Sequence, residues 1–482
     1  MAKVHFLYFD LYTGYYPSLH HGLAYLLGAL KNEGHMVSLS HLVSEDDYEM
    51  ASAFLEDNKF DLIGLSFTTN QKGHARTFLD MKKLSASLIV AGGVHCSLVR
   101  EEVFNEFPEF DGICIGEGEN SLVTLCRCLD KNENYLTTPS FYFKVDDKVI
   151  NNPLAPLREI DTLKLPDYSL FDYRKIISDG GGYFPMMLSR GCPYDCYNCC
   201  NHIFKELYRD KDKYVRFPSV EHAIKIIKNN LVLYPEAQKI IFADDTFTLN
   251  KRWLSDFCTH YSKEIGLPYS CNARVETIDD EIAQCLKDSG CLSVNFGVET
   301  GNEWLRGNIL NRRHSNEKIK ESFRIIKKYG IKAFSFNMIG LPFETKEMAR
   351  ETLQLNLELK PDFGKCFYFY PYPGTRLRQV CSENDLFGDG LKSVSGYLEA
   401  PVLKGKSMSI KDMKKYFGLL QVYFYMRLIL AKTRFPLWIE KAIVHIGLLL
   451  RRPILAFAEH KNNGMVLNVR KFVRRFAMRH LR

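Results

Sequence analysis

Short apolar runs alternate with helix-like segments along the first 135 residues. The strand-like runs lie at residues 4–9, 36–41, 62–67, 87–91 and 112–115. Between them, apolar residues recur every three or four positions, which predicts helices. Strands and helices in this order predict an α/β domain with a doubly wound parallel sheet over residues 1–135.

Small or turn-forming residues follow these predicted strands. They include Ser66, Thr68, Gly92, Gly93, Gly116 and Gly118. Doubly wound sheets bind ligands in the crevice beyond the carboxyl ends of their strands. Glycines at that edge let a bulky ligand approach the backbone, so the pattern predicts a binding domain.

The pattern changes over residues 136–180, where an alternating stretch at 141–149 precedes several prolines and predicts a hairpin and a linker. A second strand–helix series follows. Its predicted strands are residues 184–189, 239–242, 269–272, 293–298, 333–339 and 366–370. Six such units predict a (β/α)6 partial TIM barrel over residues 181–390, with functional residues just after each strand.

Residues 391–482 form a predicted helical extension with a strong positive charge. Residues 401–482 contain 18 Lys and Arg against three acidic residues, although the whole chain carries only +7. Val469, Phe472 and Phe476 share one face of a basic helix. Three interpretations stay open: peripheral contact with an anionic membrane, a lid over a lipid-like substrate, or a cap packed on the acidic remainder of the chain. The basic residues alternate with aliphatic ones, so we expect no nucleic-acid partner.

Several protein classes are excluded by composition. No apolar run reaches the ~18 residues of a membrane span, and the first residues enter a strand-like run without a signal-peptide pattern. We therefore expect a cytoplasmic protein, with membrane association through the extension as an alternative. In a reducing compartment the 14 cysteines are thiols or metal ligands rather than disulfides.

Three cysteines lie in the loop after the first strand of the second series. Cys192, Cys196 and Cys199 follow the spacing C-x3-C-x2-C. Three thiolates are one ligand short of saturating a tetrahedral zinc ion or a 4Fe-4S cluster, so an iron would stay open for chemistry. The alternative is a zinc-stabilised binding protein in which Cys200 or His202 completes the site.

This loop resembles that of the radical S-adenosylmethionine (SAM) superfamily, and together with the N-terminal domain it resembles the cobalamin (B12)-binding branch. The resemblance implies a 4Fe-4S cluster on Cys192, Cys196 and Cys199, with SAM on the fourth iron. Reductive cleavage of SAM then yields a 5′-deoxyadenosyl radical. The family usually has an aromatic residue before the third cysteine, whereas this chain has Asn198 there and Tyr197 one place earlier.

Further SAM contacts are implied after later strands of the barrel. Asp244 and Asp245 offer carboxylates for an ammonium group, and Arg274 offers a fork for a carboxylate. The order of these motifs resembles that of the superfamily. It implies that the SAM amino group lies near Asp244 and Asp245, its carboxylate near Arg274, its ribose near Glu299 and its adenine near Ile339, Gly340 and Leu341.

The resemblance also implies cobalamin along the crevice of the first domain, held base-off beside the small residues named above. The D-x-H-x-x-G signature of histidine-ligated cobalamin proteins is absent, because Tyr12 stands where its histidine would be. His95 and the pair His20 and His21 are candidate substitutes for the lower axial ligand.

The leading hypothesis is a cobalamin-dependent radical SAM C-methyltransferase acting on an unactivated carbon of a small-molecule or lipid-like substrate. An electron donor such as flavodoxin or ferredoxin would reduce the cluster. The alternative is a radical cyclisation, oxidation or rearrangement without methyl transfer.

Overall fold

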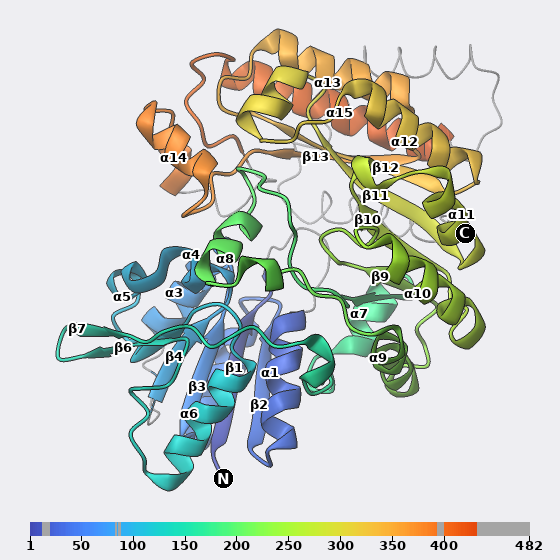
Figure 1. Cartoon of the computed structure of the whole chain (residues 1–482). Helices are drawn as coiled ribbons and strands as arrows, with labels where there is room; N and C mark the ends of the chain where they lie inside the picture. The colour runs from blue at the N-terminus through green and yellow to red at the C-terminus, as the bar shows by residue number, and fades with distance from the viewer. Residues whose placement is uncertain (12–19, 82–83, 85–87, 393–399, 431–482) are drawn as a thin grey trace. The chain divides into compact units, whose positions relative to one another are not determined.

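The computed structural model describes residues 1–11, 20–81, 84, 88–392 and 400–430 (Figure 1). The chain divides into two compact units. The first unit comprises Met1–Ile176, Met186–Glu236 and Pro371–Gln379. The second unit comprises Ile177–Pro185, Ala237–Tyr370 and the described residues from Val380 onward.

A seven-stranded sheet forms the centre of the first unit. Its strands are β1 (Lys3–Phe9), β2 (Met36–Leu42), β3 (Leu62–Ser66), β4 (Leu88–Gly92), β5 (Gly112–Cys114), β6 (Phe141–Val145) and β7 (Lys148–Asn151). They lie in the order β2-β1-β3-β4-β5-β6-β7, and the first five run parallel. The order 2-1-3-4-5 is that of a doubly wound fold, whose ligand crevice lies beyond the carboxyl ends of the strands.

The helices of the first unit cover its sheet. They are α1 (His21–Asn32), α2 (Asp47–Asp57), α3 (Lys72–Met81), α4 (Val94–Val99), α5 (Val103–Glu106) and α6 (Glu119–Lys131). Helices α1 and α6 lie side by side (Figure 1). All five residues of β3 are buried, because a parallel strand covered on both faces has no solvent side. The segment from Met186 to Glu236 adds α8 (Asn201–Leu207) and α9 (Val220–Leu233).

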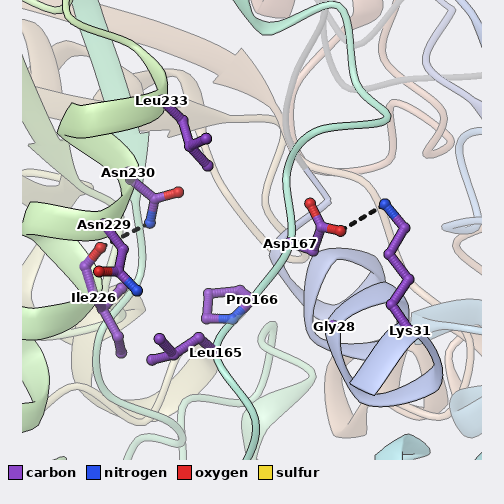
Figure 2. Close-up of a pocket in the computed structure, with 9 residues that line it drawn as sticks. All are labelled: Gly28, Lys31, Leu165, Pro166, Asp167, Ile226, Asn229, Asn230 and Leu233. Atoms are coloured by element: carbon purple, nitrogen blue, oxygen red, sulfur yellow. Dashed lines mark hydrogen bonds and ion pairs between the residues drawn. The ribbon is translucent and has the colours of Figure 1, made fainter. Parts of the chain in front are cut away.

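The predicted linker lies directly against α1 (Figure 2). A Cβ atom on Gly28 would lie 2.1 Å from the backbone oxygen of Leu165, so glycine is required for this close approach. The Asp167 N–H donates to the backbone oxygen of Ala24 at 2.8 Å, and its carboxylate pairs with Lys31 at 2.6 Å. These contacts tie the linker to the first unit.

A six-stranded parallel sheet forms the second unit. Its strands are β8 (Tyr183–Met186), β9 (Lys239–Phe242), β10 (Tyr269–Ala273), β11 (Cys291–Glu299), β12 (Lys332–Ile339) and β13 (Phe363–Tyr368). Its helices are α10 (Lys251–Glu264), α11 (Asp280–Asp288), α12 (Asn316–Lys328), α13 (Lys346–Leu359) and α15 (Ile410–Leu430). Two further helices, α7 (Tyr173–Asp179) and α14 (Arg376–Glu383), run across the division between the units. The strands lie in sequential order from β8 to β13, as in a half-barrel.

Helix α15 covers the β13 end of this sheet and packs beside α13 (Figure 1). Phe424 of α15 is 1% exposed and lies over Gly364 of β13, where a Cβ atom would come within 2.3 Å of its ring. Tyr416, Leu420 and Tyr423 belong to the same apolar cluster. The last described helix is therefore part of the second unit's core.

The predicted fold class is confirmed: an α/β sheet of the B12-binding type is followed by a parallel half-barrel and a C-terminal helix. The first sheet is mixed rather than wholly parallel, because the predicted hairpin joins its edge: β6 pairs antiparallel with β5, and β7 pairs antiparallel with β6. The predicted domain boundaries, 1–135, 136–180, 181–390 and 391–482, stay predictions.

The predicted basic helix with Val469, Phe472 and Phe476 lies outside the described residues, as does Tyr12. In the part of the chain that the structure describes, no helix combines the length and hydrophobicity that a membrane crossing requires.

Truncation of Phe424 to alanine should destabilise the second unit by about 3–5 kcal/mol, because it opens a cavity between α15 and β13. Urea unfolding followed by tryptophan fluorescence measures this, since Trp253 and Trp304 both belong to that unit. The neighbouring Tyr425 is 42% exposed, so Tyr425→Ala should change stability by less than about 1 kcal/mol. Equal effects of the two substitutions would contradict the packing role of Phe424.

Candidate functional site

A glycine turn opens the cysteine loop of the first unit. Gly191 has φ +80°, and a Cβ atom there would lie 2.4 Å from the backbone oxygen of Tyr214. Both the left-handed conformation and this close approach require glycine. The turn directs the chain from the backbone bridge between Arg190 and Arg216 into Cys192.

The three cysteines lie on a loop held by its own hydrogen bonds. Cys192 and Cys196 are buried, and Cys199 is half-buried. The backbone N–H and side-chain amide of Asn201 lie 3.5 and 3.6 Å from the Cys199 sulfur, and the His202 Nδ1 donates to the Cys196 backbone oxygen at 3.0 Å. N–H donors aimed at a sulfur stabilise its thiolate form, which is the form that ligates iron.

Three thiol ligands with N–H donors at the third sulfur fit a 4Fe-4S cluster. Within the described ranges, no three His, Cys, Asp or Glu side chains are arranged to hold a single metal ion. The ligand assignment of the cysteines stays a prediction.

The predicted cobalamin residues lie at the carboxyl ends of three adjacent strands of the first sheet. Ser66 at the end of β3 is in register with Gly92 at the end of β4. Gly93 has φ +94° and packs against the Ser66 hydroxyl, and Gly116 follows β5 with φ +74°. Thr68, Gly92, Gly93, Gly116 and Gly118 are partly exposed and form an edge of small residues, with the Tyr208 hydroxyl packed against Gly116. Such an edge fits a large planar cofactor.

The candidate axial histidines are already engaged. The His20 Nδ1 accepts from the Leu23 N–H at 3.0 Å, and its Nε2 lies 2.8 Å from the Ser66 hydroxyl. Burial lowers the pKa of His20 to about 4, so the ring is neutral at neutral pH. His21 contacts the Tyr168 hydroxyl at 3.2 Å.

His95 is fully buried between two partners. Its Nε2 lies 2.9 Å from the Glu106 carboxylate, and its Nδ1 lies 3.0 Å from the Thr69 hydroxyl. Burial would raise the pKa of Glu106, but hydrogen bonds from His95 and Lys72 lower it to about 2. An ionised carboxylate only accepts, so the His95 Nε2 carries a proton and donates it to Glu106. Neither His20 nor His95 offers a lone pair to cobalt without losing one of these bonds.

We call the strand ends that carry the predicted cobalamin residues, from Ser66 to Gly118, the cobalamin edge. An ionic cluster joins this edge to the segment that contains the three cysteines. Arg190 and Arg216 form ion pairs with Glu117, and Arg190 also pairs with Glu119. We call these four residues the Arg–Glu bridge. The bridge lies inside the first unit, and Arg190 precedes Cys192 by two residues.

The short segment Pro371–Gln379 adds a second connection inside the first unit. The Asn70 amide donates to the Tyr372 hydroxyl at 3.1 Å, and the Leu377 N–H donates to the backbone oxygen of Tyr197 at 3.0 Å. One of these contacts starts beside the cobalamin edge, and the other fixes the backbone of the predicted SAM contact Tyr197.

The other predicted SAM residues follow four adjacent strands of the second unit. They are Asp244 and Asp245 after β9, Arg274 after β10, Glu299 at the end of β11, and Ile339, Gly340 and Leu341 at the end of β12. Parallel pairing therefore brings them to one edge of the half-barrel. Asp244 is fully buried and Asp245 is exposed, so the two carboxylates have different surroundings.

Arg274 already has a partner within the chain. Arg274 is bidentate on Glu276, with its Nη2 at 2.6 Å and its Nε at 3.3 Å. The His314 Nδ1 lies 3.0 Å from the same carboxylate. Burial would raise the pKa of Glu276, but the bonds from His314 and Arg274 hold it well below its ordinary range. Arg274 could bind a SAM carboxylate only by sharing its fork with Glu276 or exchanging it.

Glu299 has a strained backbone and a buried carboxylate. Its φ is +66°, at a register shift between β11 and β12, and its side chain is 16% exposed. Burial raises the pKa of Glu299, while Arg312, 3.1 Å away, and Arg274 oppose that rise.

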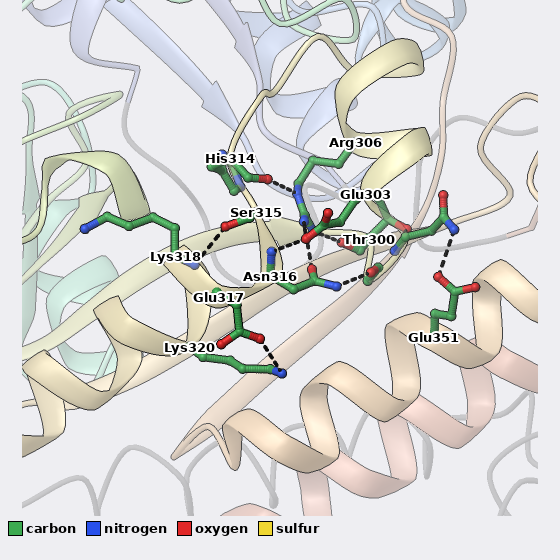
Figure 3. Close-up of polar contacts among 12 residues, drawn as sticks. Thr300, Glu303, Arg306, His314, Ser315, Asn316, Glu317, Lys318, Lys320 and Glu351 are labelled. Atoms are coloured by element: carbon green, nitrogen blue, oxygen red, sulfur yellow. Dashed lines mark hydrogen bonds and ion pairs between the residues drawn. The ribbon is translucent and has the colours of Figure 1, made fainter.

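The loop after Glu299 is held by a fully buried arginine (Figure 3). Arg306 donates to the backbone oxygens of Thr300 and His314 at 2.7 and 3.0 Å, and to the Asn316 side chain at 2.7 Å. It lies on a π-helical turn, Leu305–Ile309. The Arg306 guanidinium thus supplies hydrogen-bond donors to the backbone oxygens of this loop. These bonds can hold the unusual backbone conformation of Glu299.

The β12 turn is held by Glu344. Its Oε2 accepts the N–H groups of Gly340 and Leu341 at 2.6 and 3.1 Å, and its Oε1 is buried without a hydrogen-bond partner. Burial raises the pKa of Glu344 to about 8. Ile339, Gly340 and Leu341 are all buried, Ile339 in the core cluster of α15, so the predicted adenine contacts expose no side chain.

Sequence reasoning missed Glu276, Arg306, Arg312, His314 and Glu344. Each binds another residue rather than standing in a recognisable motif. The bridge residues Glu117 and Arg190 were adjacent to predicted motifs, which was the only available signal.

One cavity of about 250 Å³ lies in the first unit between α1, the linker and α9 (Figure 2). Lys31, Asp167, Asn229 and Asn230 contribute its polar side chains. None of the predicted site residues lines it, and we assign no ligand to it.

Two family models match the chain. The radical SAM superfamily model covers residues 186–355, and the B12-binding domain model covers residues 13–126. The chain therefore belongs to the cobalamin-dependent radical SAM family. The two domains imply a 4Fe-4S cluster, SAM and cobalamin as its cofactors.

Similar proteins include methyltransferases and cyclases. An uncharacterized methyltransferase of Pyrococcus horikoshii is 27% identical over 441 residues, which are 90% of this chain and 92% of that protein. The anaerobic magnesium-protoporphyrin IX monomethyl ester cyclase of Cereibacter sphaeroides is 26% identical over 426 residues, covering 84% of this chain and 66% of the cyclase. Among solved structures, the cobalamin-dependent SAM radical enzyme OxsB matches 100% of this chain and 76% of its own, with TM-score 0.69 and 18% identity. At that identity the match supports the fold alone.

The raised pKa of Glu344 predicts a pH-dependent stability. The folded state binds a proton that the unfolded state has released between about pH 4.5 and 8, so stability should fall as pH rises through that window. In Glu344→Gln an amide oxygen still accepts the two N–H groups and no charge develops. Thermal melts at pH 6 and 8.5 should therefore differ less for this variant than for the wild type. A matching pH dependence in both proteins would contradict the prediction.

Proposed function

We propose that this cobalamin-dependent radical SAM enzyme is a C-methyltransferase acting on an unactivated carbon. The relative from Pyrococcus horikoshii supports methyl transfer, because it carries the name methyltransferase and matches over nearly the whole of both chains. The bacteriochlorophyllide d C-8(2)-methyltransferase of Chlorobaculum tepidum, 24% identical over 345 residues, supports it further.

The observation that carries the proposal is that the cysteine loop and the cobalamin edge belong to one compact unit. The Arg–Glu bridge and the Pro371–Gln379 segment both contact the two regions. A methyl donor and a radical generator must act on one carbon atom. An enzyme that uses both therefore needs their binding loops in fixed register.

The residues of the chain divide this work. Cleavage of SAM at the cluster would supply a hydrogen-abstracting radical, and cobalamin would supply the methyl group. Cys192, Cys196 and Cys199 would hold the cluster. Arg274 would orient the SAM carboxylate by exchanging Glu276, and Glu299 would accept from ribose hydroxyls while Arg312 holds its carboxylate in place. The Gly340–Leu341 turn, whose N–H groups donate to Glu344, would lie beside the adenine.

Cyclisation is the second candidate. The cyclase of Cereibacter sphaeroides matches 84% of this chain, and in such a reaction the same radical would act without methyl transfer.

The proposed partners are a small-molecule or lipid-like substrate and an electron donor such as flavodoxin or ferredoxin. Peripheral membrane contact through the basic extension is also proposed, on the basis of the 18 Lys and Arg in residues 401–482. Sedimentation with anionic vesicles should then be lost on truncation before Gly464.

Anaerobic reconstitution of the full chain should give about four irons per chain. Alanine at Cys192, Cys196 or Cys199 should reduce iron to below about one per chain and abolish 5′-deoxyadenosine formation from SAM with dithionite. Cys200→Ala is the matched control and should retain both. Elemental analysis that finds one zinc and no iron per chain would instead support the zinc-stabilised binding protein.

Methyl-labelled SAM separates the two candidate reactions without a known substrate. In the presence of reduced cobalamin, the reconstituted protein should transfer the label from SAM to cobalamin, which chromatography with radioactivity detection measures. Formation of 5′-deoxyadenosine with no label on cobalamin would contradict methyl transfer and support cyclisation or another radical reaction.

A further inference from the structure

The Arg–Glu bridge joins two loops that are far apart in the sequence. Glu117 lies between Gly116 and Gly118 of the cobalamin edge, and Glu119 is the first residue of α6. Arg190 lies just before the cysteine loop. Its Nη1 is 3.0 Å from Glu117 and its Nη2 is 2.6 Å from Glu119. One guanidinium thus holds two carboxylates at once.

The bridge is largely withdrawn from solvent. The side chains of Arg216, Glu119 and Arg190 are 4%, 9% and 15% exposed, and that of Glu117 is 25% exposed. Burial would lower the pKa of Arg190, but the carboxylates of Glu119 and Glu117 raise it above its ordinary value. Buried charges of this kind are weakly screened by salt and tolerate little change in geometry.

Neutral contacts fix the same geometry. Arg190 and Arg216 exchange two backbone hydrogen bonds of 2.9 Å, so the arginines cannot move independently. The Glu117 N–H donates to the Tyr208 hydroxyl at 2.9 Å, and a Cβ atom on Gly116 would lie 2.3 Å from that oxygen. The Arg190 guanidinium also lies 4.5 Å from the centre of the Tyr25 ring.

This arrangement has one mechanical consequence. A displacement of the Gly116–Gly118 backbone moves Glu117, which is held by both arginines, and Arg190 transmits the movement to Cys192. When one loop becomes ordered by binding its group, the other loop also becomes more ordered. The second loop therefore loses less conformational freedom when it binds its own group.

We propose that the Arg–Glu bridge couples cobalamin binding at the Gly116–Gly118 edge to assembly of the iron–sulfur cluster on the cysteine loop. Its four members are positioning residues, because they act through the loops rather than on the bound groups. The inference rests on the proposed placement of cobalamin and the cluster, but not on methyl transfer. Because binding couplings are reciprocal, each group should raise the affinity for the other by the same factor.

The test measures hydroxocobalamin binding by absorbance titration, with the full chain before and after cluster reconstitution. The cluster should tighten binding in the wild type by about fivefold or more, the usual lower range of such couplings. Hydroxocobalamin should in turn slow iron release to a chelator. Equal cobalamin affinities with and without the cluster would overturn the proposal, whatever the reaction proves to be.

Variants locate the coupling. The affinity ratio is the cobalamin affinity with the cluster divided by that without it. Glu119→Gln and Arg190→Gln should each bring this ratio close to one, and the double variant should reduce it no further than either single variant. Arg190→Lys keeps the charge without the fork and should retain part of the ratio, which also covers the case in which Arg190→Gln does not fold. The control is Glu281→Gln, which removes an exposed ion pair with Lys251 in the second unit and should leave the ratio unchanged. Bridge variants with the wild-type ratio would overturn the role of the bridge.

Discussion

Parallel pairing of neighbouring strands is the constraint on which both units depend. A parallel strand must be followed by a connection that crosses back outside the sheet, so every carboxyl end emerges at the same edge. In the second unit this brings the loops after β9, β10, β11 and β12 into one row. In the first unit it does the same for the loops after β3, β4 and β5. The chemistry of the chain follows these two edges, while its helices and apolar clusters hold the edges in place.

The charged groups on these edges are satisfied by the chain itself. Arg274 is paired with Glu276, and Glu299 with Arg312. A buried charge without a partner would cost several kcal/mol, so each arrives with a counter-charge. In the proposed SAM site, a zwitterionic ligand would exchange one partner for another, which would limit the desolvation cost of binding. Fixed partners such as Arg306 and Glu344 differ from these, because they hold backbone turns rather than exchangeable charges.

Family membership and the structure bear on different questions, the first on the cofactors and the second on the reaction. Membership of the cobalamin-dependent radical SAM family defines the cofactors, whereas relatives named as methyltransferases and as cyclases share similar identity with this chain. In the proposed reaction, what reaches the substrate radical would decide between methyl transfer and cyclisation. The first unit bears on this point, since the same compact body contains the cobalamin edge, the cysteine loop and the bridge between them.

The sequence by itself determined the element order, both sheets and the cysteine motif. These depend on local apolar periodicity and on spacing within a few residues, as in β9, whose predicted and observed ranges coincide. Only the tertiary structure decided that the hairpin joins the first sheet and that His20 and His95 are engaged by other side chains. It also decided that Arg190 holds Glu117 and Glu119. The partners are far apart in the sequence: 46 residues for His20–Ser66, 71 for Arg190–Glu119 and 73 for Arg190–Glu117. No local sequence pattern encodes these pairs, because the polar side chains need a partner only once folding has buried them and brought their loops together.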